Sequence, residues 1–413
     1  MTADVAVVAV TGMAALTTIG ASCAELAAAL RTGRSGIRVD PDDADGVCAT
    51  LADFDLRAWA REHAPDQAAE LVKVAGRAAL PAQTAAAVAV RALDDGKLAE
   101  ADRDGTAVLI AGNNLALGYH ASVWQQYAAR PGSVRPSHIL THLDTDVLGV
   151  VSELTGAREA GSTVGGASAS GNLAVIAGTR LVRSGEVDRV LVVAPAAELS
   201  AAEITALRRS GALAVREPHR APEQTCRPFD RSRRGFVRGQ GAAAVLLESK
   251  HAAARRGVTG RAVVAGYGQR LDGTRGAAPN VDGQVAALRR ALADAGVRPA
   301  QVDYVNAHGT GSVAGDPVEA DALREVFGGH RPLVNSTKPL TGHCLTAAGV
   351  VELVATVLQM EAEFVHGNPT LGALIPGAPA LTGPAAVPAT LDVAVSHSVA
   401  FSGINATVVL RAG

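Results

Sequence analysis

The chain alternates short apolar runs with longer segments in which apolar residues recur at helical spacing. The short runs have the length and β-branched content of buried strands, whereas the periodic segments have the length of helices. The runs predict strands at 5–10, 106–111, 189–194, 242–247, 261–267, 302–306, 332–335 and 407–411. The periodic segments predict helices at 24–31, 82–95, 172–183, 282–295, 317–326 and 344–361. This alternation indicates an α/β fold.

The second part of the chain repeats the alternation of strands and helices predicted for the first part, which indicates a diverged duplication. We therefore expect an N-terminal half at 1–250 and a C-terminal half at 251–413. No Pro/Ser-rich linker separates them, so the halves are expected to share one structural body. The segment 130–148, irregular in its Pro, His and Asp content, is expected to be a long loop.

Composition excludes several functional classes. The chain has 413 residues, of which 48% are hydrophobic and 19% charged, and its formal net charge is −2. Such a balance attracts neither nucleic acid nor an anionic membrane. No apolar run approaches the roughly 20 residues of a membrane span, and the start lacks the basic region of a signal peptide. The four cysteines show no Cys-X-X-Cys spacing, so we expect no disulfide framework and a cytoplasmic protein.

A turn of small residues is the most informative local feature. The run Thr163-Val-Gly-Gly-Ala-Ser-Ala-Ser-Gly171 predicts a strand, a sharp turn and then a helix. Ser168 lies at the apex, at the positive end of that helix, where a nucleophile or an oxyanion is stabilised. Alone this serine is weak evidence, because the Gly-X-Ser-X-Gly motif of serine hydrolases is absent.

Two later segments add two histidines and a lysine in similar settings. His308 follows an apolar strand and precedes Gly-Thr-Gly, while Lys338 and His343 lie in Ser-Thr-Lys-Pro-Leu-Thr-Gly-His. Each histidine alone is typical of a protein core. Together with Ser168 they predict a catalytic site, because two neutral imidazoles that converge on one oxygen form an oxyanion hole.

Two other groups of residues favour ordinary structural roles. His138 and His142 have the spacing of two metal ligands on one helix face, but Pro136 favours a loop and no third ligand is evident. We therefore expect no metal site. The basic run 231–234 is typical of a solvated surface, with docking of an acidic carrier protein as the sharper alternative.

The acidic residues Asp316 and Glu319 leave two structural interpretations open. They can pair with Lys338 or cap the helix that follows them. A metal role is the weaker interpretation.

Taken together, the motifs resemble those of β-ketoacyl synthases of the decarboxylating Cys-His-His class. They run over essentially the whole chain: Asp230-Arg-Ser-Arg-Arg-Gly, Val305-Asn-Ala-His-Gly-Thr-Gly311, Gly315-Asp-Pro-Val-Glu319, Ser336-Thr-Lys-Pro-Leu-Thr-Gly-His343 and Gly403-Ile-Asn-Ala-Thr407. The resemblance implies a thiolase-like five-layer αβαβα fold made of two duplicated halves, in a homodimer. It implies no bound cofactor, because the substrate arrives on the phosphopantetheine arm of an acyl carrier protein. Thr310 and Ser312 are then expected to contact that arm.

Two departures from the family pattern affect the expected chemistry. Ser168 stands where the family has its nucleophilic cysteine, and the usual Gly-Phe-Gly-Gly loop reads Ala-Phe-Ser-Gly, with Phe401 and Gly403 retained. Val399 replaces the usual bulky gate residue of this oxyanion and gating loop. A serine hydroxyl stays un-ionised at neutral pH, whereas a thiol at a helix N-terminus readily becomes a thiolate. Ser168 is therefore expected to accept an acyl chain poorly.

Decarboxylation does not need the nucleophile. In the family, two histidines hold the thioester oxygen while the enolate forms, and here these are His308 and His343. Lys338, with Glu319, is expected to orient the histidine and tune the charge of the site. The pattern resembles the free-standing malonyl-carrier-protein decarboxylases of polyketide β-branching cassettes, which convert malonyl to acetyl carrier protein.

Two alternative functions stay open. One is a condensing enzyme or acyltransferase in which Ser168 is acylated. The other is a non-catalytic partner subunit that resembles chain-length factors; such subunits also lose the cysteine, but are not expected to keep both histidines and the lysine.

Overall fold

The computed structural model describes residues 7–413, and its main feature is a mixed sheet of ten strands. The first half of the chain contributes β1 (Val8–Thr17), β4 (Thr106–Ala111), β5 (Gly161–Val164), β6 (Arg189–Ala194) and β8 (Gly241–Ser249). The second half contributes β9 (Ala262–Leu271), β10 (Tyr304–Asn306), β11 (Leu333–Asn335), β14 (Val393–Ala400) and β15 (Ile404–Ala412).

The strands of both halves follow the same plan. Their order is β5-β4-β6-β8-β1 in the first half and β11-β10-β14-β15-β9 in the second. In each half the first three strands of this order are parallel, and the last two pairings are antiparallel. The two five-stranded parts join where β1 pairs with β9. Identical order and direction confirm the predicted duplication.

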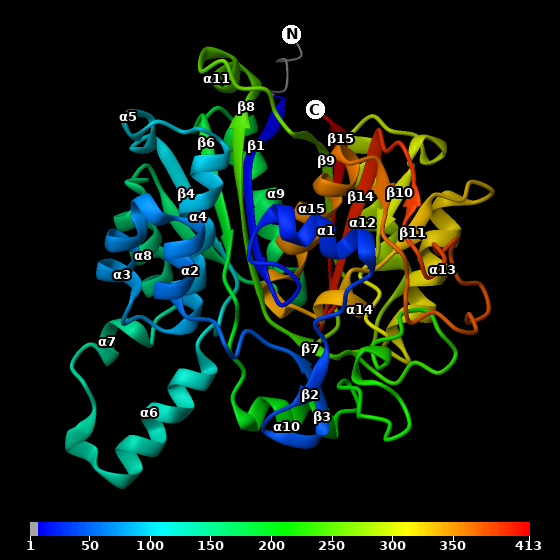
Figure 1. The fold of residues 1–413 in the computed structure, drawn as a ribbon. Coiled ribbons are helices and arrows are strands. Elements are labelled where there is room, and N and C mark those ends of the chain that lie inside the picture. The colour runs from blue at the N-terminus through cyan, green and yellow to red at the C-terminus, as the bar shows by residue number, and fades with distance from the viewer. Residues whose placement is uncertain (1–6) are drawn as a thin grey trace.

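Helices complete the five layers of the fold (Figure 1). The larger ones are α1 (Cys23–Thr32), α4 (Leu80–Asp95), α8 (Thr145–Thr155), α9 (Ser170–Arg183), α12 (Val281–Asp294), α13 (Gly315–Phe327) and α15 (Ala348–Glu361). α9 and α15 pack between the two five-stranded parts, α4 and α8 cover the outer face of the first, and α12 and α13 cover that of the second. α15 is buried on nearly all sides, which explains why most of its residues are apolar.

The central helices α9 and α15 touch through glycine. A Cβ on Gly171 would lie 2.6 Å from the backbone nitrogen of Val350, and a Cβ on Gly349 would lie 2.6 Å from that of Asn172. Any larger residue would push the helices apart, because interiors are close-packed. This contact fixes the beginnings of both helices, next to the candidate site.

Smaller elements lie around this framework. The remaining strands are β2 (Arg38–Asp40), β3 (Asp43–Ala49), β7 (Arg238–Gly239), β12 (Phe364–Val365) and β13 (Val387–Pro388). The remaining helices are α2 (Leu56–His63), α3 (Ala68–Ala75), α5 (Glu100–Arg103), α6 (Leu117–Ala129), α7 (His138–Thr141), α10 (Ala201–Arg209), α11 (Lys250–Arg255) and α14 (Lys338–Thr341). None of the helices in residues 7–413 has the length and apolarity to cross a membrane.

One predicted element is wrong, and another lies partly outside the described residues. The expected loop 130–148 contains α7 and the beginning of α8, because Val147, Val150 and Val151 form a buried helical face. The strand predicted at 5–10 begins among residues outside the description, and β1 is described from Val8.

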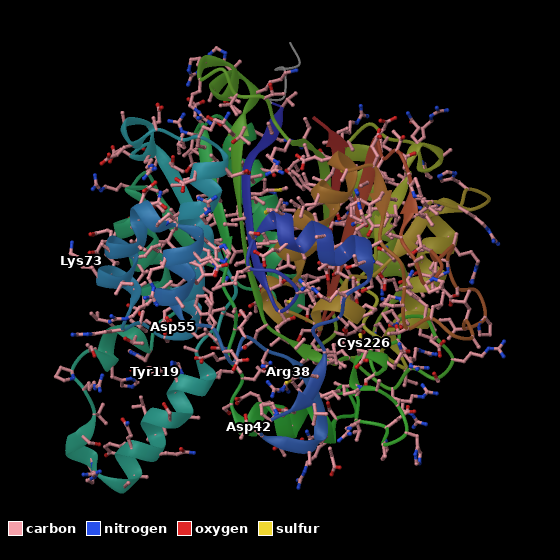
Figure 2. All side chains as sticks on the ribbon, in the orientation of Figure 1. Arg38, Asp42, Asp55, Lys73, Tyr119 and Cys226 are labelled. Carbon is pink, nitrogen blue, oxygen red and sulfur yellow. The ribbon has the colours of Figure 1, made fainter. Side chains whose placement is uncertain are left out.

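The segment α6–α7 projects away from the body of the molecule (Figure 1), and Tyr119 marks it in Figure 2. No residue of α6 is buried, and Trp124 is 69% exposed. Ile139 and Leu140 on α7 are also exposed. An apolar surface of this kind is typical of a protein–protein contact.

Candidate active site

Ser168 lies in a strained turn between β5 and α9. A short 3₁₀ turn, Ala167–Ala169, precedes the helix, and Ala167 has a positive φ of 47°. The Ser170 hydroxyl holds the turn: it accepts the N–H of Gly166 at 2.9 Å and donates to the carbonyl of Ala167 at 2.7 Å. Half-buried Ser168 is therefore held beside the positive end of a helix, as the sequence predicts.

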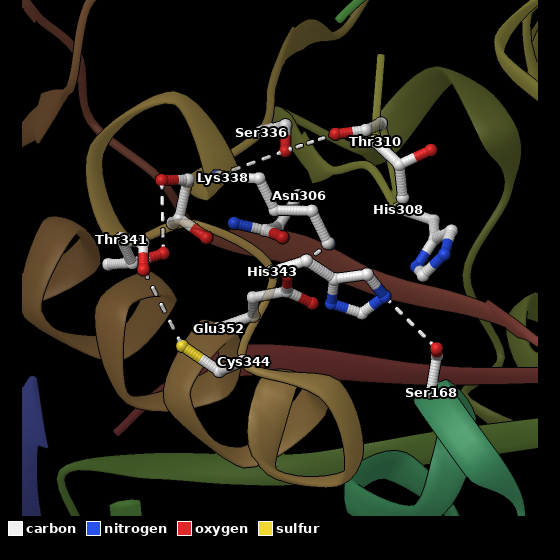
Figure 3. Close-up of polar contacts among 12 residues, drawn as sticks. Ser168, Asn306, His308, Thr310, Ser336, Lys338, Thr341, His343, Cys344 and Glu352 are labelled. Atoms are coloured by element: carbon white, nitrogen blue, oxygen red, sulfur yellow. Dashed lines mark hydrogen bonds and ion pairs between the residues drawn. The ribbon is translucent and has the colours of Figure 1, made fainter. Parts of the chain in front are cut away.

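His343 is held by backbone contacts on both sides. Its N–H donates to the carbonyl of Val237 at 2.8 Å. The N–H of Leu345 donates to Nδ1 of the imidazole at 3.2 Å. Because Nδ1 accepts, the hydrogen-bond pattern assigns the single proton of the neutral ring to Nε2. This Nε2–H then donates to Ser168 Oγ at 3.0 Å (Figure 3).

His308 follows β10, and the carboxylate of Glu319 on α13 fixes its backbone. Glu319 accepts the N–H groups of His308 at 2.7 Å and Gly309 at 2.8 Å. The His308 ring meets the His343 ring edge to face, with centroids 5.3 Å apart. In Figure 3 both rings border the space above Ser168. The structure therefore brings together the serine and the two histidines that the sequence predicts.

Both imidazoles are neutral at physiological pH. Burial lowers the pKa of His308 well below its usual value, and the charge of Lys338 and the neighbouring His343 act in the same direction. Burial and the charge of Lys338 likewise lower the pKa of His343. Each ring thus carries one N–H, which is available for an oxygen that gains negative charge.

Lys338 is fully buried on α14, and its partner is not the residue expected. Its ammonium group forms an ion pair with Glu352 on α15 (Figure 3). Neither Glu319 nor Asp316 pairs with it, because their carboxylates accept backbone N–H groups instead. The charge of Lys338 therefore lowers the pKa of both histidines, whereas Glu319 holds the backbone of His308 in place.

Asp316 and Glu319 on α13 hold neighbouring loops through backbone hydrogen bonds. Asp316 accepts the N–H groups of Phe229 at 2.7 Å and Ser312 at 3.1 Å. Burial raises the pKa of Asp316 to about 6 and that of Glu319 to about 7, against the effect of these donors. Within the described residues no cluster of three or more metal-ligating side chains occurs, His138 and His142 included.

A cavity of about 360 Å³ opens onto the three central residues. Its wall includes four further residues predicted from the sequence, Thr310, Ser312, Val399 and Phe401. Gly403 lies behind this wall: its carbonyl accepts the N–H of Asp272 at 2.8 Å, and its φ of 66° suits glycine. The candidate site is thus a pocket whose chemically reactive side chains are Ser168, His308 and His343.

One arginine of the basic run 231–234 contacts the wall of this cavity. Arg233 donates to the carbonyls of Ser312 at 3.0 Å and Val313 at 2.8 Å, which braces the cavity wall. Arg231 and Arg234 are exposed. The run is therefore partly structural and partly a positively charged surface.

Sequence reasoning missed four residues that shape the site. Glu352 had a signal, because it is an acid within the largely apolar first half of α15, at 348–355. Asp272 and Phe236 line the cavity from loops without a recognisable pattern. His397 lies fully buried on β14, where burial lowers its pKa to about 3 and its Nδ1 contacts Thr407 Oγ1 at 2.8 Å.

Comparison with known proteins gives the class of protein that this fold and site define. The family profile "Beta-ketoacyl synthase, N-terminal domain" matches residues 6–253, and "Beta-ketoacyl synthase, C-terminal domain" matches residues 261–371. The chain therefore belongs to the β-ketoacyl synthase family.

The chain is also similar to individual proteins over nearly its whole length. The chain is 32% identical to the polyketide biosynthesis malonyl-ACP decarboxylase PksF of Bacillus subtilis, over 98% of this chain and 96% of that protein. It is 29% identical to 3-oxoacyl-[acyl-carrier-protein] synthase 2 of Vibrio harveyi, over 98% of both. Among solved structures, the ishigamide ketosynthase/chain length factor superposes with a TM-score of 0.87 at 30% identity, over 99% of both chains.

Proposed function

We propose that the protein decarboxylates malonyl-acyl carrier protein to acetyl-acyl carrier protein in polyketide biosynthesis. The observation that carries this proposal is the pair of neutral imidazoles, His308 and His343, which lie next to residue 168. This residue is a serine, where the family pattern has a cysteine. The likeness to a malonyl-ACP decarboxylase over nearly the whole chain supports the same reaction.

The geometry suits the formation of an enolate. The thioester oxygen of the malonyl group is placed between the N–H groups of His308 and His343. As the carboxylate leaves as carbon dioxide, its bonding electrons move through C2 onto this oxygen, and both N–H donors hold the charge. Because the histidines are buried, each hydrogen bond is stronger than it would be in water.

Acylation of Ser168 is disfavoured by the same hydrogen bonds. A general base must accept the serine proton. His343 Nδ1 already accepts the N–H of Leu345, and its Nε2 carries the proton and points to Ser168. No lone pair of His343 is free for the hydroxyl, so the serine-dependent condensing enzyme or acyltransferase is the weaker candidate.

A non-catalytic partner subunit is the other candidate. The likeness to a ketosynthase/chain length factor keeps it open, since that title includes both kinds of subunit. His308, His343 and the buried pair of Lys338 with Glu352 argue against it, because this arrangement serves no purpose in a subunit without chemistry. Isolation of the protein only as a heterodimer would favour this alternative.

Two partners follow from the proposal. An acyl carrier protein would present the substrate, and exposed Arg231, two residues before the Arg233 that contacts Ser312 of the cavity wall, fits an acidic docking partner. A second copy of the chain would cover the exposed edge strand β5 and the apolar side chains of α6 and α7. Light scattering of the purified protein at micromolar concentration should give the mass of a homodimer, and a monomer would contradict this.

The function is tested by incubating the purified protein with malonyl-loaded carrier protein and following the carrier by intact mass. Formation of acetyl-loaded carrier protein supports the proposal. A malonyl-loaded carrier that stays unchanged, with every acyl carrier tested, contradicts it.

A further inference from the structure

We propose that the Ser168 hydroxyl donates the proton that converts the enolate into the acetyl group. This inference rests on the proposed decarboxylation and assigns its second step. Loss of carbon dioxide leaves an enolate whose C2 carries excess electron density. Without an acyl group on residue 168 to attack, C2 must take up a proton before the product can leave.

The hydrogen-bond pattern leaves the serine hydrogen free. Ser168 Oγ accepts the Nε2–H of His343 at 3.0 Å, which is its one hydrogen bond among the described residues. The tautomer of His343 is fixed by the Leu345 N–H at Nδ1. Oγ therefore acts as the acceptor of this bond, and its own hydrogen points elsewhere, toward the cavity that Ser168 lines.

The position of Oγ suits transfer to C2. When the thioester oxygen lies between the two histidines, C2 lies one carbon further along the substrate. Ser168 Oγ lies within hydrogen-bond distance of the same His343 nitrogen that holds the thioester oxygen. The hydroxyl therefore borders C2 from one side, and an enolate carbon is basic enough to take a proton from a hydroxyl.

The step balances with water as co-reactant. The Oγ–H bond of Ser168 breaks, and the electron pair of the enolate forms the new C2–H bond. The negative charge that develops on Oγ is stabilised by the beginning of α9 and by the His343 Nε2–H, which passes from the thioester oxygen to Oγ as the enolate loses its charge. A water molecule from the cavity returns a proton to Oγ, and the hydroxide left behind combines with carbon dioxide. The sum is malonyl thioester plus water giving acetyl thioester plus bicarbonate.

Helix α9 supplies a matched control at its other end. Ser184 follows the last residue of α9, its side chain is exposed, and its hydroxyl donates to the carbonyl of Leu181 at 3.0 Å. It does not line the cavity. Ser184→Ala therefore removes a hydroxyl from the same helix without touching the candidate site.

The first test measures how long the enolate survives. An enolate that waits for a proton recaptures ¹³C-labelled carbon dioxide and returns as labelled malonyl carrier protein. A positioned general acid contributes about 10²–10⁴-fold to a proton transfer. Ser168→Ala should therefore raise the ratio of label exchange to acetyl formation by at least about tenfold. Ser184→Ala should leave this ratio at the wild-type value, and an unchanged ratio in Ser168→Ala would overturn the inference.

The second test needs no variant. The wild-type protein decarboxylates stereodefined malonyl carrier protein with one deuterium at C2, in tritiated water, and the product methyl group is analysed for chirality. A single donor on one side of C2 gives a chiral methyl group, and a racemic methyl group overturns the inference. Acetyl product with a racemic methyl group leaves the decarboxylase function intact, whereas absence of any acetyl product refutes that function itself.

Discussion

The turns that precede α9 and α15 are the same structure used twice, with different chemistry. Ala167 and Leu345 both have a positive φ, 47° and 51°, and each begins a 3₁₀ turn that leads into a central helix. The next residue is Ser168 in the first half and Thr346 in the second.

The second half places both candidate catalytic histidines around its turn. His343 lies two residues before Leu345, and His308 follows β10 in the same half. In the first half the equivalent strand β4 leads instead to Asn113, and Gly165 lies two residues before Ala167. Under the proposed function, loss of carbon dioxide depends on the second half, whereas protonation of the carbanion depends on Ser168 in the first half. A change at Ser168 would then alter the fate of the carbanion without disabling the histidines.

The largest effect is expected from breaking the buried ion pair of the second half. Lys338→Met leaves the carboxylate of Glu352 without a partner in the interior, which should cost about 3–5 kcal/mol of unfolding free energy. Lys338→Met/Glu352→Leu should regain most of this loss, because no charge is then buried. Urea denaturation measures both, and equal losses in the single and double variants would contradict the account.

The next effect concerns the glycines at which the two halves meet. Gly349→Ala and Gly171→Ala should each destabilise the protein by about 1–3 kcal/mol, because the new methyl group meets the backbone of the opposite helix. Gly149→Ala on α8 is the control, since a Cβ there has no neighbour within 4 Å. This control should gain about 0.5–1 kcal/mol from helix propensity. Thermal melts that rank the three variants otherwise would show that the helix crossing is less tight than described.

A smaller effect is expected when the serine at position 168 is replaced by cysteine. Ser168→Cys places a thiol at the beginning of α9, where a thiolate is stabilised. It should acquire a covalent acyl group from acyl carrier protein, whereas the wild type should not. Intact mass spectrometry detects the adduct. Complete failure of loading would mean that the loop from Val399 to Gly403 also prevents acylation.

The smallest effect concerns pH: we expect no protonation of His308 or His343 in the pH dependence of kcat/KM. The pKa values of His308 and His343 are lowered, so both rings stay neutral as the pH falls through the ordinary histidine value of about 6.5. Because the neutral form supplies the N–H donors, kcat/KM should not decline with a midpoint near that pH. A midpoint at about 6.5 would indicate solvent-exposed histidines.

Much of the fold could be predicted from the sequence because its elements are local and repeated. The apolar runs of β4 and β6 coincide with the predicted strands, and the duplicated order follows from their rhythm. β14 was missed because Ser396, His397 and Ser398 interrupt its apolar pattern. These polar side chains are nevertheless fully buried, which only the packing of β14 against its neighbours shows.

The candidate site was predictable only in part. Ser168, His308 and His343 each lie in a turn of small residues, which is a local signal. The partner of Lys338 was not predictable, because α13 and α15 both carry more than one acid and only the three-dimensional arrangement selects Glu352. The division into halves at residues 250 and 251 stays a prediction.

The most direct test compares the turnover of malonyl to acetyl carrier protein by the wild type, His308→Ala and His343→Ala, with Ser184→Ala as control. Each histidine variant should lose about 2.7–4 kcal/mol of transition-state stabilisation, or two to three decades in rate, while carrier binding and Ser184→Ala turnover stay close to wild type. If both histidine variants, folded as judged by circular dichroism, decarboxylate at near wild-type rates, the protein does not act through an enolate held by its second half.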